Sequence, residues 1–359
     1  MTIYLTILGF LSIFSLLELF QINIKYRQKL FLYWVVVIVL VLVAGLRYGL
    51  ETDYWHYYNI FTEKYQVSSL ELGFKAFNSL IRLFTKEYGI YCLIVAIISM
   101  GLKGKIFSKL KYPFIILLCY YLRFYVLFEL NAIRQGIAMT FVIVAIYNLK
   151  NDNLKKYFVF LGIGFLFHSA SICGLFALFL RNRKFKFKQI VFVYFFCVIF
   201  RLFLFDTVIS SLGKYIPYVL SSTNNLIHGA QYIINSGDKM QEMNYFSLAR
   251  VIIPGVCLYF ISDTEENKLY YNLYFVGSVL NLLFWGLDTI AFRIPATFYI
   301  FEGFMLSNAL FRNKLFGKKK KDWVFTICLM CIAFCDVWTF ISYLTDSITL
   351  VPYKSILFK

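Results

Sequence analysis

Charged residues are scarce in this sequence: 15% of its 359 residues are Asp, Glu, Lys or Arg, and 60% are hydrophobic. An average soluble domain carries about 25% charged residues, so the composition excludes that class. The chain shows no internal repeat, low-complexity linker or separate soluble segment. We therefore expect one membrane domain that fills residues 1–359.

Histidine is almost absent, and the cysteines stand apart from other metal ligands. The chain has three His and eight Cys, and the cysteines lie in apolar runs, where Cys behaves as a small hydrophobic residue. Cys328, Cys331 and Cys335 share a helix face, but no cluster of His or carboxylates accompanies them. The sequence therefore predicts no metal site and no cofactor.

The apolar residues are gathered in blocks long enough to cross a bilayer. A helix of about 20 apolar residues spans the hydrocarbon core, which indicates an all-α, polytopic integral membrane protein. The first block lacks a basic leader and a small-residue cleavage site, so we expect a permanent span there. The clearest blocks cover residues 3–20, 30–46, 113–127, 189–205, 269–285, 296–311 and 323–344.

The net charge of +17 is interpreted as a topology signal and not as a nucleic-acid surface. Most of the 36 Lys and Arg lie in short bridges between apolar blocks, as the positive-inside rule predicts for cytoplasmic loops. Arg123 and Arg201 fall within spans, where pairing with acids or with span carbonyls is expected. The inner bridges are residues 25–29, 103–111, 150–156, 181–188, 268 and 312–321.

These bridges define a path with outer loops at about 47–87 and 206–245. Within the first loop, residues 70–84 alternate apolar and polar residues at helical spacing, which predicts a helix lying at the interface. Residues 157–180 have basic loops on both sides and are too short for two full spans. We interpret them as a hairpin of two short helices with its tip at 167–169, giving about 12 membrane helices. The alternative is one tilted span, which would reverse the membrane orientation of all later segments and place residues 312–321 outside.

Ionisable residues collect at the outer ends of the predicted spans. Such residues are costly near hydrocarbon, so each is a functional candidate. Several arginines with few compensating acids predict a polyanionic ligand, because guanidinium binds phosphate oxygens bidentately. Anchoring of helices at the headgroup level is the alternative for each arginine. The set comprises Arg47, Asp53, Glu129, Arg134, Gln135, His168, Arg250 and Arg293.

The general base and the aromatic contacts are left open by the sequence. His168 lies at the tip of the hairpin and is either a base or a hydrogen-bonded core residue. Asp53, Glu51 and Glu129 compete for the base role. Tyr54, Trp55, Tyr57 and Tyr58 follow the second span, where they either stack on sugar rings or belong to the aromatic belt.

Five short motifs resemble the EpsG-like branch of Wzy-type bacterial polysaccharide polymerases, and they follow that family's order along most of the chain. The resemblance is thinner in the C-terminal half, where Arg250 and Arg293 lie. The motifs are Gly45-Leu46-Arg47 with Asp53-Tyr54, Glu71-Leu72-Gly73-Phe74, Arg134-Gln135-Gly136-Ile137-Ala138, Phe167-His168-Ser169 and Pro352-Tyr353-Lys354.

The resemblance implies a glycosyltransferase of O-antigen, lipopolysaccharide, capsule or exopolysaccharide synthesis, acting at the outer face of the bacterial cytoplasmic membrane. Its donor and acceptor would be oligosaccharides on undecaprenyl pyrophosphate, and a chain-length regulator would be a further partner. Arg47, Arg134 and Arg293, with Arg250 as a fourth, would bind pyrophosphate without a metal. Gln135, Tyr54 and Tyr57 would contact substrate, and His168, Asp53 or Glu51 would act as the base.

Three other classes compete with a polymerase. A flippase for the lipid-linked unit would also need arginines, but it should carry a cavity open to both sides and often shows repeat symmetry. An O-antigen ligase shares the donor and the chemistry. A sugar acyltransferase would use a His near an Asp or Asn.

Overall fold

The computed structural model describes residues 1–22, 25–64, 70–183, 185–205, 207–208, 268–285, 288–312 and 320–358. These residues form helices and contain no strand, which confirms the all-α prediction. Six helices are long and apolar enough to cross a membrane, and two shorter apolar helices accompany them at Ser169–Leu180 and Leu269–Leu283. The number of 12 membrane helices stays a prediction.

The chain divides into two compact units. The first contains Met1–Leu178, Ile300–Leu315 and Ala333–Lys359, and the second contains Phe179–Tyr299 and Phe316–Ile332. The single membrane domain predicted for the whole chain stays a prediction. The predicted outer loop at 206–245 lies outside the described residues except for 207–208.

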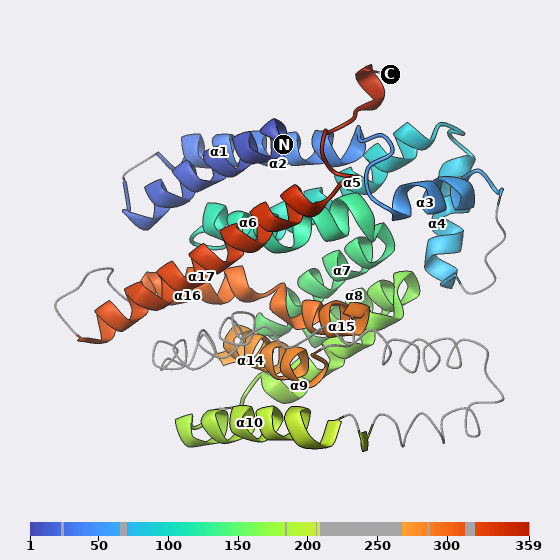
Figure 1. Ribbon diagram of the computed structural model, residues 1–359. Helices are drawn as coiled ribbons and strands as arrows, with labels where there is room; N and C mark the ends of the chain where they lie inside the picture. The colour runs from blue at the N-terminus through green and yellow to red at the C-terminus, as the bar shows by residue number, and fades with distance from the viewer. Residues whose placement is uncertain are drawn as a thin grey trace. The chain divides into compact units, whose positions relative to one another are not determined.

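The first unit is a bundle of long helices (Figure 1). In it α2 packs on α5, α5 on α7, and α1 on α6. The chain of α6 continues without interruption into the π-helix η1, which ends one residue before α7. The helices are α1 (Thr2–Leu19), α2 (Tyr26–Gly45), α5 (Tyr88–Phe107), α6 (Pro113–Tyr120), η1 (Tyr121–Asn131) and α7 (Ile133–Lys150).

Two of the predicted basic bridges meet at one end of this bundle. Lys29 Nζ lies 2.7 Å from Glu18 Oε1 and donates to the Lys111 carbonyl at 3.3 Å. The other Glu18 oxygen accepts from the amides of Phe114 and Ile115, so the carboxylate caps the N-terminus of α6. Lys29 and Lys111, the last residues of bridges 25–29 and 103–111, are therefore neighbours.

The segment after α2 carries two short helices, α3 (Asp53–Phe61) and α4 (Leu72–Arg82). Helix α4 confirms the helix predicted over residues 70–84, and it runs steeply across the direction of α1 and α2 (Figure 1). One face of α4 buries Phe74, Asn78 and Ile81, while Leu80 lies on the exposed face.

The predicted hairpin is confirmed. Helix α8 (Leu154–Phe167) is followed by the 3₁₀-helix η2 (Ser169–Leu175) and by α9 (Phe176–Leu180). His168 separates them in an extended conformation, with φ −160° and ψ 128°. The Tyr157 hydroxyl donates to the Gly174 carbonyl at 2.9 Å, which places the return arm back against the start of α8.

Later helices close the first unit around Arg123. This residue of η1 is ion-paired with Glu302, which begins α16 (Glu302–Arg312), and its Nε lies 3.8 Å from Asp336 of α17 (Lys320–Asp346). Both carboxylates are buried. The expectation that Arg123 pairs with acids is therefore confirmed.

In the second unit, α14 (Lys268–Leu283) packs on α15 (Asp288–Tyr299) and on α10 (Phe187–Ile199). The Asn272 amide donates to the carbonyls of Leu180 and Arg183 at 2.8 and 2.9 Å, which fixes α14 against the chain leaving α9. Arg201 Nε donates to the Trp285 carbonyl at 2.7 Å, confirming that it pairs with a span carbonyl.

Candidate functional site

The polar site of the first unit begins in the turn between α2 and α3. Helix α2 can approach α5 closely because it ends in glycine: a Cβ on Gly45 would lie 2.8 Å from Leu93 Cα. The backbone then turns through two left-handed residues, Gly49 with φ +59° and Glu51 with φ +65°. A positive φ is uncommon for a residue with a side chain, and such strain concentrates at functional sites.

Arg47 lies in this turn and is almost wholly enclosed, with 1% of its surface exposed. Its Nη1 donates to the Ala44 carbonyl. Its Nε and Nη2 have no hydrogen-bond partner among the described residues. The groups that act on it electrostatically are Cys92 and the phenols of Tyr54, Tyr88 and Tyr125. Buried polar atoms are normally paired, so these two nitrogens are candidate contacts for an anion, a role that stays a prediction.

The C-terminal segment holds the backbone around Arg47. Tyr48 N donates to the Lys354 carbonyl at 2.9 Å, Ile356 N donates to the Leu46 carbonyl at 2.9 Å, and Arg47 forms a β-bridge with Ser355. The Tyr353 hydroxyl also donates to the Val43 carbonyl, at 2.9 Å. Residues 353–356 thus run beside the arginine and form an isolated β-bridge with it, a pairing that the sequence did not predict.

Glu51 faces Tyr343 of α17, whose hydroxyl donates to its Oε1 at 2.9 Å. The carboxylate is buried, with 5% of the residue exposed. Burial raises the pKa of Glu51 above its ordinary value, and the nearby Asp53 charge adds to this, while the Tyr343 hydrogen bond opposes it. A carboxyl group of this kind is suited to general acid–base chemistry.

Arg134 lies in the first turn of α7 and points toward α3 and α4. Its Nη1 donates to Glu71 Oε2 at 2.9 Å, and its Nε lies 3.5 Å from the Tyr57 hydroxyl. The guanidinium carbon is 5.9 Å from the ring centroids of both Tyr57 and Phe74. The Arg134 side chain is 24% exposed, so it lies at the surface of the unit and is accessible to a ligand.

The remaining predicted residues of the first unit occupy nearby elements. Asp53 begins α3, and its amide donates to Asn131 Oδ1 at 3.2 Å, which ties α3 to the turn before α7. Gln135 is buried in α7. Nδ1 of His168 accepts from the Ala170 amide at 3.2 Å, so this histidine caps η2. The catalytic and binding roles of these residues stay predictions.

The aromatic residues of α3 differ in exposure. Tyr54 and Tyr57 are buried and pack edge-on, Tyr54 against Tyr88 and Tyr57 against Phe74. Trp55 is 45% exposed, so its ring is the one most open to a sugar.

Two predicted arginines are not among the described residues of the first unit. Arg293 belongs to α15 of the second unit and is partly exposed. Arg250 lies outside the described residues. Their convergence with Arg47 and Arg134 stays a prediction. Among the described residues, no group of three or more His, Cys, Asp and Glu is placed to hold a metal ion.

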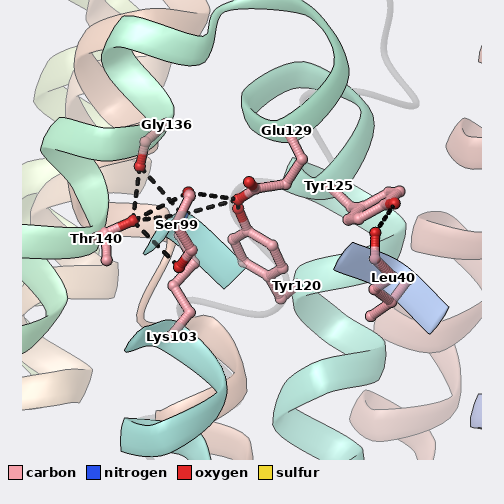
Figure 2. Close-up of polar contacts among 8 residues, drawn as sticks. All are labelled: Leu40, Ser99, Lys103, Tyr120, Tyr125, Glu129, Gly136 and Thr140. Atoms are coloured by element: carbon pink, nitrogen blue, oxygen red, sulfur yellow. Dashed lines mark hydrogen bonds and ion pairs between the residues drawn. The ribbon is translucent and has the colours of Figure 1, made fainter. Parts of the chain in front are cut away.

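Lys103 contradicts the expectation that it belongs to an inner basic bridge. Helix α5 continues to Phe107, so Lys103 stays inside the bundle with 0% exposure. Its ammonium lies 2.8 Å from Glu129 Oε1, which also accepts from Ser99 and Tyr120 (Figure 2). This pairing occupies Glu129 and removes it from the candidates for the base. The sequence signal for this contact is Ser99, which lies four residues before Lys103 in an apolar run and therefore on the same helix face.

The fold defines a polytopic membrane protein. One of its helical units contains a buried arginine, a partly exposed arginine and a buried carboxylate. The model of the EpsG family matches residues 30–355. The chain belongs to this family of Wzy-like polysaccharide polymerases. No curated protein and no solved structure matches it.

Proposed function

We propose that this protein is a glycosyltransferase that joins oligosaccharide repeat units carried on undecaprenyl pyrophosphate. It acts at the outer face of the bacterial cytoplasmic membrane, in O-antigen, capsule or exopolysaccharide synthesis. Family membership supports the polymerase class. The observation that carries the substrate assignment is Arg47, a buried guanidinium with two nitrogens lacking a hydrogen-bond partner among the described residues.

A pyrophosphate is the anion that this arrangement suits. Arg47 offers N–H groups within an enclosed site of low dielectric, where each charge-assisted hydrogen bond is stronger than in water. Arg134 offers a second guanidinium that is partly exposed and is balanced by Glu71. In the proposal Arg293 adds a third contact and Arg250 a fourth, while Gln135, Tyr54 and Tyr57 line the substrate. The reaction needs no metal, because the arginines stabilise the leaving group.

The proposed reaction is a displacement at the anomeric carbon of the donor. A hydroxyl of the acceptor sugar attacks this carbon and forms the new glycosidic bond. The bond to the pyrophosphate oxygen breaks, and the lipid pyrophosphate leaves with the electron pair. A base takes the hydroxyl proton. Glu51 fits this role best, since burial raises its pKa toward the working range of a general base. Asp53 and His168 are the other candidates.

A gel of surface polysaccharide tests the proposal. A host strain that lacks the gene receives either the wild-type gene, Arg134→Ala or the control Arg82→Ala. Arg82 is an arginine of α4 whose Nη1 pairs with the exposed Glu63, so its loss should leave activity within about twofold. We expect wild type and Arg82→Ala to restore the full ladder, and Arg134→Ala to leave single repeat units on their carrier or acceptor.

Other outcomes would identify the rivals. Absence of every surface repeat unit, with lipid-linked units accumulating inside the cell, would indicate a flippase. Polymer that accumulates on the lipid carrier without reaching its final acceptor would indicate a ligase. An unchanged ladder in the deletion strain would refute a role in this polysaccharide.

A further inference from the structure

The Lys103 ammonium lies at the centre of a buried polar network (Figure 2). Four oxygen atoms surround its Nζ, from Ser99, Thr140, Glu129 and Gly136, at 2.6, 2.7, 2.8 and 3.1 Å. An ammonium has three N–H donors, so one donor is shared. Neither Lys103 nor Glu129 contacts solvent to any useful extent, their side chains being 0% and 1% exposed.

Three of these oxygens come from the two sides of one turn, and the fourth, from Ser99, belongs to α5 itself. Glu129 belongs to the end of η1, whereas Gly136 and Thr140 belong to the first turns of α7. The same ammonium therefore bridges the helix that enters the turn at 130–135 and the helix that leaves it. Thr140 Oγ1 also lies 3.2 Å from Ser99 Oγ, which ties α7 a second time to α5.

The backbones on the two sides of this turn pack closely together. A Cβ on Gly136 would lie 2.2 Å from the Phe128 carbonyl oxygen, so η1 and α7 touch at backbone level. The Ala132 amide donates to the Leu127 carbonyl at 2.6 Å and completes the π-helical register of η1. A π-helix is rare, and the short π-bulges in which it usually occurs are frequent at functional sites.

The turn carries the groups that meet the outer helices. Asn131 accepts from the first amide of α3, and Arg134 reaches Glu71 at the start of α4 and Tyr57 on α3. The network lies beneath them. Ser99 is eleven residues into α5, roughly 16 Å from its start at 1.5 Å per residue. Any shift of the turn moves Arg134 against α3 and α4.

We propose that Lys103 is a positioning residue that holds Arg134 in its working geometry, an inference that rests on the polymerase function proposed above. Lys103 does not touch substrate. It fixes both ends of the turn at 130–135 through Glu129, Gly136 and Thr140. With the ammonium gone, the Glu129 charge stays in a site of low dielectric without its counter-ion, and η1 separates from α7.

The test uses Lys103→Met in the full-length protein, in detergent or nanodiscs. Lys105→Met is the matched control, because Lys105 lies two residues further along the same helix and is exposed. The first readout needs no activity: phenylglyoxal modifies accessible arginines, and peptide mass spectrometry follows Arg134 beside the exposed reference Arg27. We expect Arg134 to react several-fold faster in Lys103→Met, with Arg27 unchanged and Lys105→Met equal to wild type. An unchanged Arg134 rate in Lys103→Met would overturn the proposal.

The second readout is polymerisation of purified lipid-linked repeat units. Misplacing a catalytic group by about 1 Å costs about a hundredfold in rate, so kcat should fall by about that factor, with a smaller change in KM. Combined with Arg134→Ala, the Lys103→Met change should cost nothing further, because both act through one guanidinium. Additive losses would overturn the proposal. Absence of polymer with wild-type protein would refute the polymerase function, while the modification rates would still decide the positioning role.

A double variant that removes both charges distinguishes a positioning role of Lys103 from a purely stabilising one. Lys103→Met combined with Glu129→Gln leaves no uncompensated charge, so the thermal unfolding temperature should recover most of what Lys103→Met alone loses. The ammonium bridge across the turn is still missing, so kcat and the Arg134 modification rate should stay at the Lys103→Met values. Full recovery of kcat together with stability would show that Lys103 only balances charge.

Discussion

Replacing Arg47 by Met is expected to abolish activity without weakening the fold. The substitution removes one hydrogen bond from a charged donor, worth about 1.5–3 kcal/mol. It also removes two buried nitrogens that have no hydrogen-bond partner among the described residues, and each orphan group costs about 1–3 kcal/mol. These terms oppose each other, so the free energy of unfolding should fall by no more than about 1 kcal/mol and can rise.

Arg123→Met is the matched control, the same substitution at an arginine whose partners are known. Arg123 lies between Glu302 and Asp336, both buried. Its removal leaves buried carboxylates uncompensated and should cost about 3–5 kcal/mol. Thermal unfolding of the two purified variants in one detergent compares the effects, and polymerisation of lipid-linked repeat units measures activity. We expect Arg47→Met to lose about a hundredfold or more in kcat, as for the loss of one donor to developing charge.

The result that refutes this reasoning is a loss of stability in Arg47→Met equal to that in Arg123→Met. Arg47 would then be an anchor of the α2–α3 turn, and its two nitrogens would not mark a ligand site. Retained activity with unchanged stability would also refute it, because pyrophosphate binding would then not need Arg47.

Two further predictions concern the other arginine and the buried carboxylate. Arg134→Lys keeps the charge but cannot reach both Glu71 and Tyr57, so kcat/KM should fall at least about tenfold; activity equal to wild type would exclude bidentate binding. Tyr343→Phe removes the hydrogen bond that lowers the pKa of Glu51, so the acidic limb of the pH–rate profile should move to higher pH, and Glu51→Gln should abolish that limb. The pKa of Glu51 is raised in the folded state, so its contribution to stability is present below the unfolded-state pKa. This contribution is lost as the pH rises through the folded-state pKa. Thermal unfolding of wild type and Glu51→Gln across that pH range would detect the loss.

The membrane helices could be predicted because their signal is local. A bilayer demands about 20 consecutive apolar residues, and that length can be counted in the sequence. The break at His168 could also be predicted from segment length. Residues 157–180 lie between two basic loops and are too short for two full spans, which favours a hairpin of two short helices. The two-sided character of α4 follows from the spacing of its apolar residues.

The contacts that complete the site could not be predicted in this way. Glu51 and Tyr343 are 292 residues apart in sequence, and nothing in either neighbourhood indicates the other. The positive-inside rule predicts that Lys103 lies in an inner loop, because it is the first of four lysines between two apolar blocks. Only the packing of η1 and α7 against α5 shows that four oxygens take the place of water there.

The pairing of Tyr353 with Val43 joins residues 310 positions apart. Arg47 is synthesised early, whereas residues 353–356, which hydrogen-bond to the backbone beside it, follow the intervening helices in the sequence. Such long-range closure is slow and comes late in folding. A chain that stops before residue 353 would carry the arginine but not the segment that fixes it. A chain truncated before residue 353 is therefore expected to leave the backbone around Arg47 without these hydrogen bonds.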